Sequence, residues 1–431
     1  MLRCAKIIIL LILTVLTLTG CGLRTVDQLY CLPKRSETHN NLQAVIDEAM
    51  DGLAFSAPTY GDNRQTVQAA DLDGDGVDEY LAFATDSSDK PLKILIFCQL
   101  ASGYVLMDTI EGYGFAFDFV EYAQLDDRPG VEIIVGRQVS DQVARAVSVY
   151  RFSSGFSRQL LSTGYSRLDT CDLDQDGINE IFLLNYASAE NGNGLVTLFS
   201  YQEGEMQRSA EQNLSMPASH FERFTVGGLV DGRQAMFVTC EKEDKSLVTD
   251  VFVMDDQELT AVSKGISTQP LRGYPVFPVD VDGDNITELA HLLPVTSFGE
   301  ARSHYLLQWY SLDSAGNETE KRCTFHHYAE GWYLTVDRKW AADIAVEQTQ
   351  DETVIYYLDA GIHEALVHIR ALTDTDREEQ AKQPGLTILH KGNAVIYVAE
   401  LTEYAKEQGI AEEMLISQFH TIRAELMTEE E

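Results

Sequence analysis

The stretch ADLDGDGVDEYLAF, residues 70–83, determines how the rest of this sequence is interpreted. It recurs as CDLDQDGINEIFLL at residues 171–184 and as VDVDGDNITELAHL at residues 279–292. In each copy an acidic turn leads directly into an apolar run that is typical of a strand. Three copies of this length in one frame form an internal repeat, and a repeat constrains the fold more than any single motif does.

Two weaker copies lie between the intact ones. Residues 124–136 (QLDDRPGVEIIVG) keep the frame but carry Gln124 and Arg128 in place of acids, and residues 228–238 (GLVDGRQAMFV) form a shorter copy around Asp231. Together the five copies begin about 48 to 57 residues apart, inside or just above the range expected for propeller blades. The sequence leaves open whether the weak copies form complete blades.

The intervals between the copies read as strands. After the first acidic turn, strand-like runs separated by turn residues cover residues 80–84, 92–100, 104–108 and 115–122. Helical periodicity is absent from roughly residue 65 to residue 315. We therefore predict a mainly β fold, a β-propeller of four-stranded blades over residues 41–320, because radial repetition removes long exposed sheet edges.

The acidic turns have the chemistry of oxygen ligation to a hard cation. Carboxylates at the first, third, fifth and ninth positions converge if the chain turns sharply at the sixth, and the seventh position offers a backbone carbonyl. Flexible cages of six or more oxygens suit Ca²⁺, whereas Mg²⁺ prefers fewer protein ligands and retained waters. We expect up to three structural calcium sites, formed by Asp71, Asp73, Asp75, Val77 and Glu79, by Asp172, Asp174, Asp176, Ile178 and Glu180, and by Asp280, Asp282, Asp284, Ile286 and Glu288.

The sixth position requires a residue that tolerates positive φ. Gly76 and Gly177 meet this requirement, and Asn285 replaces them in the third loop because asparagine enters the left-handed region more readily than most residues. The loop at residues 124–132 lacks two acids, so we expect it to be free of metal, with the guanidinium of Arg128 able to occupy the place of the cation. A solvated acidic turn without any metal is the alternative interpretation of all these loops.

These loops resemble those of FG-GAP or VCBS repeats, the calcium-loop blades of integrin α-chain propellers and of many bacterial surface proteins. Residues 41–83, in which a helix-like run at 42–50 precedes the first acidic loop, are also similar to VCBS-repeat lipoproteins of Gram-positive bacteria. The chain departs from the family pattern by lacking the Phe-Gly-Gly-Ala-Pro motif and by using Glu at the ninth position. The resemblance implies a propeller and calcium, and it does not imply catalysis.

The N-terminus has the pattern of a lipoprotein signal peptide over residues 1–20. Arg3 and Lys6 precede an uncharged run at residues 7–19, which is shorter than the roughly 20 residues that a membrane-spanning helix needs. The run ends in LTGC, which resembles a lipobox, so we expect Cys21 to carry the lipid and residues 21–40 to form a stalk. An ordinary secretory signal is the alternative. The predicted location is the outer face of the cytoplasmic membrane of a Gram-positive bacterium.

Residues 321–431 read as a small α+β domain that ends in an amphipathic helix over residues 402–427. The aromatic residues Trp332, Tyr333 and Trp340 fit core packing better than a ligand groove. Beyond Cys21, five widely spaced cysteines give no metal or redox motif, and we expect no disulfide among them.

Composition excludes some classes of function. The 431 residues include 68 acidic and 32 basic ones, a net charge of −36, which argues against nucleic acid or an anionic membrane surface as a partner and favours cations. No catalytic motif stands in a suitable context. The sequence favours a binding or scaffold protein with a protein or polysaccharide ligand at the cell envelope. The alternative is an envelope polysaccharide hydrolase or lyase, which requires acidic and aromatic side chains to converge in one deep pocket.

Overall fold

The computed structural model describes residues 37–139, 145–185, 192–255, 258–271, 273–298, 304–359 and 362–422. The expected signal peptide (1–20), Cys21, Cys31 and the stalk up to residue 36 lie outside these residues. Within the described ranges, no helix has the length and apolar character needed to cross a membrane.

The first sheet follows helix α3 (Glu37–Ala49), which confirms the helix predicted near residues 42–50. Strands β1 (Ala54–Phe55) and β2 (Val67–Ala70) both pair with β3 (Glu79–Thr85), and β4 (Leu92–Leu100) and β5 (Gly103–Gly112) complete the antiparallel sheet. Helix α3 packs against β5. Its buried face, which includes Leu42 and Ile46, shares one core with Phe97 and Tyr104.

Three antiparallel sheets of four strands follow, each in chain order. Their strands are β6 (Ala116–Ala123), β7 (Glu132–Gln138), β8 (Arg145–Ser153) and β9 (Phe156–Tyr165); β10 (Arg167–Cys171), β11 (Glu180–Asn185), β12 (Leu195–Gln202) and β13 (Glu205–Asn213); and β14 (Phe221–Gly228), β15 (Gln234–Glu241), β16 (Leu247–Asp255) and β17 (Glu258–Thr268). A 3-10 turn, Ala218–His220, precedes β14. The four-stranded sheets predicted from the repeat are confirmed, and both weak copies of the repeat belong to complete sheets.

Four copies of the repeat occupy the same place, in the loop before the second of four consecutive antiparallel strands, whereas the copy at residues 280–287 leads from the isolated bridge at Val279 into β18. The loop at 71–78 joins β2 to β3, the loop at 124–131 joins β6 to β7, and the loop at 172–179 joins β10 to β11. The run at 115–122 therefore opens the second sheet instead of closing the first, because Val120 of β6 pairs with Val135 of β7. The predicted strands were placed correctly, but the unit that they form begins one strand earlier than expected.

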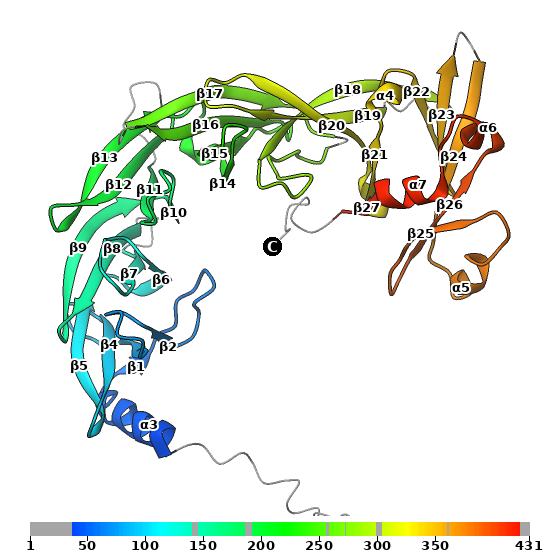
Figure 1. Ribbon diagram of the computed structural model, residues 1–431. Coiled ribbons are helices and arrows are strands. Elements are labelled where there is room, and N and C mark those ends of the chain that lie inside the picture. The colour runs from blue at the N-terminus through cyan, green and yellow to red at the C-terminus, as the bar shows by residue number, and fades with distance from the viewer. Residues whose placement is uncertain are drawn as a thin grey trace, which may run out of the picture.

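The sheets follow one another along an arc (Figure 1). The fourth strands β5, β9, β13 and β17 contact one another in sequence and lie on the outer side of the arc, whereas the first strands β2, β6, β10 and β14 lie on its inner side. The first sheet and the C-terminal strands stand at opposite ends, so the described sheets form an open arc (Figure 1). Inner first strands and outer fourth strands are the arrangement of propeller blades.

The last sheet has ten strands, in the order β25-β26-β24-β23-β22-β18-β19-β20-β21-β27. Strand β18 joins its two halves, since it pairs antiparallel with β19 and, through Thr296 and Ala345, parallel with β22. The domain boundary expected at residue 320 falls inside β20. The strands are β18 (Glu288–Phe298), β19 (His304–Leu312), β20 (Glu318–His327), β21 (Trp332–Val336), β22 (Ile344–Gln348), β23 (Thr353–Asp359), β24 (Ile362–Leu372), β25 (Thr387–Lys391), β26 (Ile396–Leu401) and β27 (Phe419–Thr421).

The helix predicted over residues 402–427 is wrong as a single element. Helix α6 (Glu403–Glu407) ends before Gly409, whose φ of 82° lies in the left-handed region that stops a helix. Helix α7 (Glu412–Gln418) follows, and the chain then pairs with β21 as strand β27. Two further short helices, α4 (Arg338–Ala341) and α5 (Arg377–Gln380), flank this sheet.

The aromatic residues of the C-terminal part pack in a core, as predicted. Trp332 is fully buried and its ring lies 6.0 Å from that of Phe325 and 5.5 Å from that of Phe419, measured between ring centroids. The four cysteines within the described residues, Cys98, Cys171, Cys240 and Cys323, are free thiols. Burial raises the pKa of Cys240 to about 12, which keeps this thiol protonated.

Candidate metal centre

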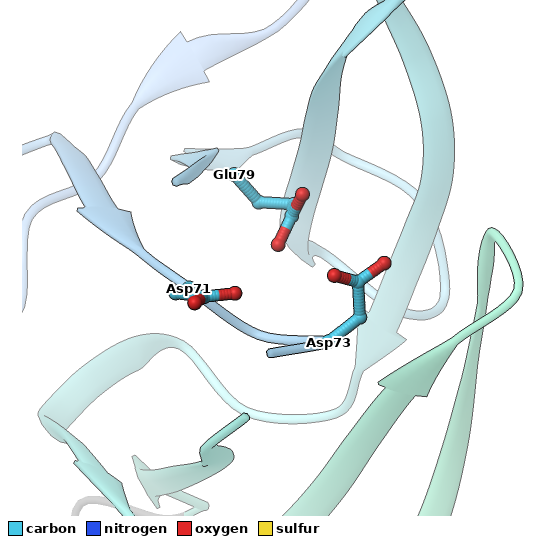
Figure 2. A group of neighbouring side chains, drawn as sticks. All are labelled: Asp71, Asp73 and Glu79. Atoms are coloured by element: carbon cyan, nitrogen blue, oxygen red, sulfur yellow. The ribbon is translucent and has the colours of Figure 1, made fainter. Parts of the chain in front are cut away.

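In each intact acidic loop, three carboxylates converge on one point. Figure 2 shows Asp71 and Asp73, from the loop after β2, and Glu79, at the start of β3, pointing toward one another. One carboxylate oxygen of each lies within 4.8 Å of the others. The equivalent groups are Asp172, Asp174 and Glu180, and Asp280, Asp282 and Glu288.

The first aspartate of each loop forms the turn. Asp71 accepts hydrogen bonds from the backbone N–H groups of Gly74 and Gly76, at 2.8 Å and 3.0 Å. Asp172 and Asp280 accept equivalent bonds from the backbone of their own loops. These bonds hold the loop in a tight coil, as in an Asx turn, and orient the carboxylate without a metal.

The sixth position has positive φ in all three loops, as predicted. The angles are 84° at Gly76, 90° at Gly177 and 64° at Asn285. The fourth position is left-handed as well, which we did not predict, and the residues there are Gly74, Gln175 and Gly283. Glycine at two of these three positions was the signal that could have revealed this second turn.

The ninth-position glutamates are buried at the base of the loops. Glu79 is 4% exposed and accepts a 3.0 Å hydrogen bond from the N–H of Leu72, and Glu180 and Glu288 accept the same bond from Leu173 and Val281. Burial, helped by repulsion from the loop aspartates, raises the pKa of Glu79 to about 7. The same causes raise the pKa of Glu180 to about 8. A cation at the centre of each group would relieve this repulsion and favour the ionised carboxylates.

The fifth-position aspartates have a different role. Asp75 accepts a 2.8 Å hydrogen bond from the N–H of Val77, and Asp176 and Asp284 accept the equivalent bonds from Ile178 and Ile286. None of the three belongs to its loop's group of converging carboxylates. The structure thus brings together the first, third and ninth positions, while the fifth closes the turn onto the seventh.

The weak loop at residues 124–132 keeps the ninth-position glutamate but turns differently, since its left-handed residue is Gly130 at the seventh position, and it contains its own cation. Glu132 accepts a 2.7 Å hydrogen bond from the N–H of Leu125, as the ninth residue does in the intact loops. The guanidinium of Arg151, from β8, forms ion pairs with Asp126 and, at 2.8 Å, with Glu132. Its side chain is 8% exposed, and those of the two acids are 0% and 1% exposed. A positive charge therefore lies between the third and ninth carboxylates of this loop.

The prediction that Arg128 fills this place is wrong. The side chain of Arg128 is exposed. Its backbone takes part in the turn, donating from N–H to Asp126 at 2.8 Å and accepting from the amide of Gln124. Arg128 lies on the rim of the loop, whereas Arg151 approaches from the adjacent strand beneath it.

Strand register explains why Arg151 reaches the acids. Ile133 pairs with Tyr150, so Arg151 stands across from Glu132 on the neighbouring strand. In the three intact loops, the residue across from the ninth-position glutamate has a short side chain, namely Cys98, Ser200 or Ser311. No cation from this strand position neutralises those carboxylates. The sequence signal was Arg151, an arginine inside the apolar run of β8. Its role could be recognised only once the strand pairing was known.

The third loop is partly neutralised from outside. The Nζ of Lys321 lies 2.6 Å from Asp284 and 4.0 Å from Glu288, and the Nη2 of Arg322 lies 2.7 Å from Asp282. Both cations come from β20 and remain partly exposed, at 20% and 28% of their side chains. We did not predict this contact, because β20 follows the loop by more than 30 residues.

Neighbouring loops contact each other. A Cβ added to Gly74 would lie 2.3 Å from the Cβ of Pro129, so the first loop packs directly on the weak loop. Asn179, after the second intact loop, donates its N–H to the carbonyl of Gln124 at 2.8 Å. The weak copy at residues 228–238 contacts the third loop in the same way, through Gly228 and Asn285. The loops thus link adjacent sheets, and whatever stiffens a loop also stiffens the contact between sheets.

Among the described residues, no group of three converging carboxylates lies at the second weak copy. Its Asp231 accepts hydrogen bonds from Ser314, and Gln234 begins the strand that follows it. Hydrogen bonds from Ser314 to the Asp231 carboxylate thus hold this loop, and they lower the pKa of Asp231.

Comparison of the chain with protein-family models and with curated proteins gave no match. The likeness to FG-GAP or VCBS repeats therefore stays a prediction from the loop residues. The geometry of the loops carries the functional argument on its own.

Proposed function

We propose that this chain is a calcium-binding, propeller-like protein in which ions at three loops stabilise the packing of adjacent sheets. The position of Arg151 is the main observation in support of this proposal. In the one loop that lost two of its acids, the fold supplies a buried guanidinium to the third and ninth carboxylates. The intact loops keep the acids and have Cys98, Ser200 or Ser311 in place of the arginine. In the first two intact loops no ion pair to the converging carboxylates is found within the described residues, and in the third Lys321 and Arg322 balance the charge only in part, so we propose that ions from solution supply the rest.

Calcium fits the donor set better than other common cations. Three carboxylates meet at each site, and main-chain carbonyls and waters could complete the six to eight oxygens that Ca²⁺ takes. Mg²⁺ requires a near-ideal octahedron and retains its waters, which a tightly coiled loop with three converging carboxylates does not favour. The residues that would hold the ion are the first, third and ninth of each loop.

The proposed role of calcium is structural. The loops contact one another across sheet boundaries, so bound ions would stiffen the arc. By the sequence pattern of residues 1–21, we further propose that Cys21 anchors the chain by a lipid to the outer face of the cytoplasmic membrane of a Gram-positive bacterium. There the arc would act as a binding or scaffold protein at the envelope.

A thermal melt tests the proposal. The mature form without residues 1–20, and with Cys21→Ser to avoid lipidation, is melted in EGTA and then over a calcium titration, with magnesium as the control. We expect calcium to raise the melting temperature in a concentration-dependent way and magnesium to raise it much less. Equal melting temperatures in EGTA and in saturating calcium would contradict the proposal.

A further inference from the structure

A pocket of about 550 Å³ lies between the second, third and fourth sheets, apart from the acidic loops. Most of its walls come from β6, β10 and β14 and from residues 60–63 before β2, and Arg145 of β8 and Tyr165 of β9 complete them. Because β6, β10 and β14 are the first strands of their sheets, the pocket lies on the inner side of the arc (Figure 1). Its volume is in the range of small-molecule sites, roughly 300–1,000 Å³.

The carboxylates of this pocket are held in place by their neighbours. Asp118 accepts a 2.6 Å hydrogen bond from the hydroxyl of Tyr165 and pairs with Arg145 at 3.4 Å. Glu121 accepts a 2.6 Å hydrogen bond from the hydroxyl of Thr170. These contacts join β6 to β8 and β9 of its own sheet and to β10 of the next, so the acids are oriented before any ligand arrives.

The charges of the pocket nearly balance. Burial raises the pKa of Glu121, and it raises that of Asp169 too, which favours their neutral forms. Arg145 compensates Asp118. With every group ionised, the lining has five acids and three arginines, which are Asp62, Asp118, Glu121, Asp169, Glu222, Arg145, Arg167 and Arg223. Whether or not Glu121 and Asp169 are ionised, the lining has no net positive charge, so the pocket offers many hydrogen-bonding groups without attracting anions.

Aromatic rings lie beside these polar groups. Tyr60 is 68% exposed on the segment that borders the pocket. Its backbone N–H donates to the carbonyl of Asp118 at 2.8 Å, which fixes the segment to β6. The rings of Phe221 and Phe224 are 4.7 Å apart, and the guanidinium of Arg167 lies 5.8 Å from the ring of Phe221. Both polar and apolar faces are therefore available to one ligand.

We infer that this pocket binds a neutral, hydroxyl-rich ligand, namely a saccharide unit. Sugar hydroxyls donate to the carboxylates and accept from the guanidinium groups, and the C–H face of a sugar ring packs on an aromatic ring. This saccharide is the ligand that we assign to the binding role proposed above. The assignment depends on that role and does not depend on the calcium sites. No lining residue belongs to an acidic loop. A negative result in the sugar titration therefore leaves the calcium proposal intact, and a negative result in the calcium titration leaves the saccharide proposal intact.

Calorimetric titration of the mature form with cellotriose, maltotriose and chitotriose tests the inference, with trigalacturonate as the anionic control. At least one neutral trisaccharide should bind. Tyr60→Ala should weaken it roughly fivefold or more, and Glu121→Gln combined with Asp169→Asn should weaken it as well. Tyr113→Ala, which removes a tyrosine that is 60% exposed outside this pocket, should leave the affinity unchanged.

Another outcome is that the parent protein cleaves a trisaccharide and that Glu121→Gln abolishes the cleavage. This result would also support saccharide binding in the pocket and would make the protein a hydrolase. Three results would overturn the inference: no neutral trisaccharide binds, binding is unaffected by the Tyr60 and Glu121/Asp169 variants, or trigalacturonate binds with the same dependence on them. Matching melting temperatures of the variants and the parent exclude unfolding as the cause of a loss.

Discussion

The first intact loop and the weak loop at residues 124–132 share a buried ninth-position glutamate and differ in the source of their positive charge. In both, the ninth-position glutamate is buried and accepts a hydrogen bond from the second residue of the loop. The weak loop takes its charge from Arg151, whereas the intact loop has Cys98 at that strand position. One fold thus solves the same electrostatic problem in two ways, by a covalently attached cation and, as we propose, by a dissolved one.

The largest effect is expected from removing the attached cation. Arg151→Ala leaves Asp126 and Glu132 buried without a counter-charge, which costs about 3–5 kcal/mol when one partner of a buried ion pair is lost. Urea unfolding at pH 7 measures the change. Calcium should not restore the stability of this variant, because only two carboxylates remain in the loop. A loss below about 1 kcal/mol would show that Arg151 does not balance these acids.

A second variant tests whether the weak loop can be converted into an intact one. Gln124→Asp with Arg151→Ser gives the weak loop the first, third and ninth carboxylates and the short strand residue of an intact loop. We expect its stability to depend on calcium more strongly than that of the parent protein. An equal calcium response in the double variant and the parent would mean that these positions do not define the site.

Removing one charge from an intact loop should have the next largest effect. Asp73→Asn should lower the free energy of unfolding by about 2–3 kcal/mol in calcium at 100 times the dissociation constant, because the bound ion contributes about that much. In EGTA it should change stability little. Asp78→Asn is the matched control, since Asp78 is an exposed acid of the same loop outside the carboxylate group. Equal losses with and without calcium would indicate a structural role only.

The pH dependence follows from the buried glutamates. The pKa values of Glu79 and Glu180 are raised from 4.5 to about 7 and about 8 in the metal-free fold. The folded state therefore binds protons more tightly than the unfolded chain, so these groups stabilise the fold below pH 4.5 and lose this contribution as pH rises toward 8. In EGTA, the parent should lose more stability between pH 5 and pH 8 than a Glu79→Gln/Glu180→Gln variant does.

The same raised pKa values should make calcium binding weaker at low pH. Each glutamate must give up its proton to bind the ion, and one linked proton changes the affinity by at most about tenfold per pH unit. Calcium titrations at pH 6 and pH 8.5 measure this. Affinity that is independent of pH over this range would contradict a role for Glu79 and Glu180 as ligands.

The smallest effect is expected at the third loop. This loop keeps its three carboxylates, as an intact loop does, but has cationic side chains nearby, as the weak loop does. Lys321 and Arg322 pair with Asp284 and Asp282 and would compete with an ion. Lys321→Met with Arg322→Met should strengthen calcium binding at this loop roughly fivefold, since a partly exposed ion pair contributes at most about 1 kcal/mol. Calorimetry of this variant beside Arg338→Met, an exposed arginine that pairs with Glu320, gives the comparison. An unchanged affinity would show that the two cations do not compete.

Local features of the loops could be predicted from the sequence because they depend on residues close in the chain. Gly76, Gly177 and Asn285 were recognised as left-handed positions. The acidic spacing predicted that four carboxylates of each loop converge, and the first, third and ninth do so while the fifth does not. Four-stranded sheets followed from the repeat length and from the apolar runs between turns. These features depend on the backbone angles that each residue allows and on the two-residue period of a strand. Both can be recognised in a short stretch of sequence.

Features that depend on distant pairing could not be predicted. Arg151 reaches Glu132 only through the register of β7 and β8, and Lys321 reaches Asp284 across two further strands. The open arc depends on how whole sheets pack, and the pairing of β27 with β21 replaced a helix that residue periodicity had suggested. Each case required a contact between residues that the sequence separates, and side-chain pattern alone does not encode such a contact.

The most direct test of the account is to locate the ions. Crystals of the mature form grown in calcium would be measured for anomalous scattering, which marks the position of each bound ion. We expect a peak among the three carboxylates of the loops at residues 71–79 and 172–180, a weaker one at residues 280–288, and none at residues 124–132, where Arg151 takes the place of the ion. A peak beside Arg151, or no peak in any of the intact loops, would contradict this expectation.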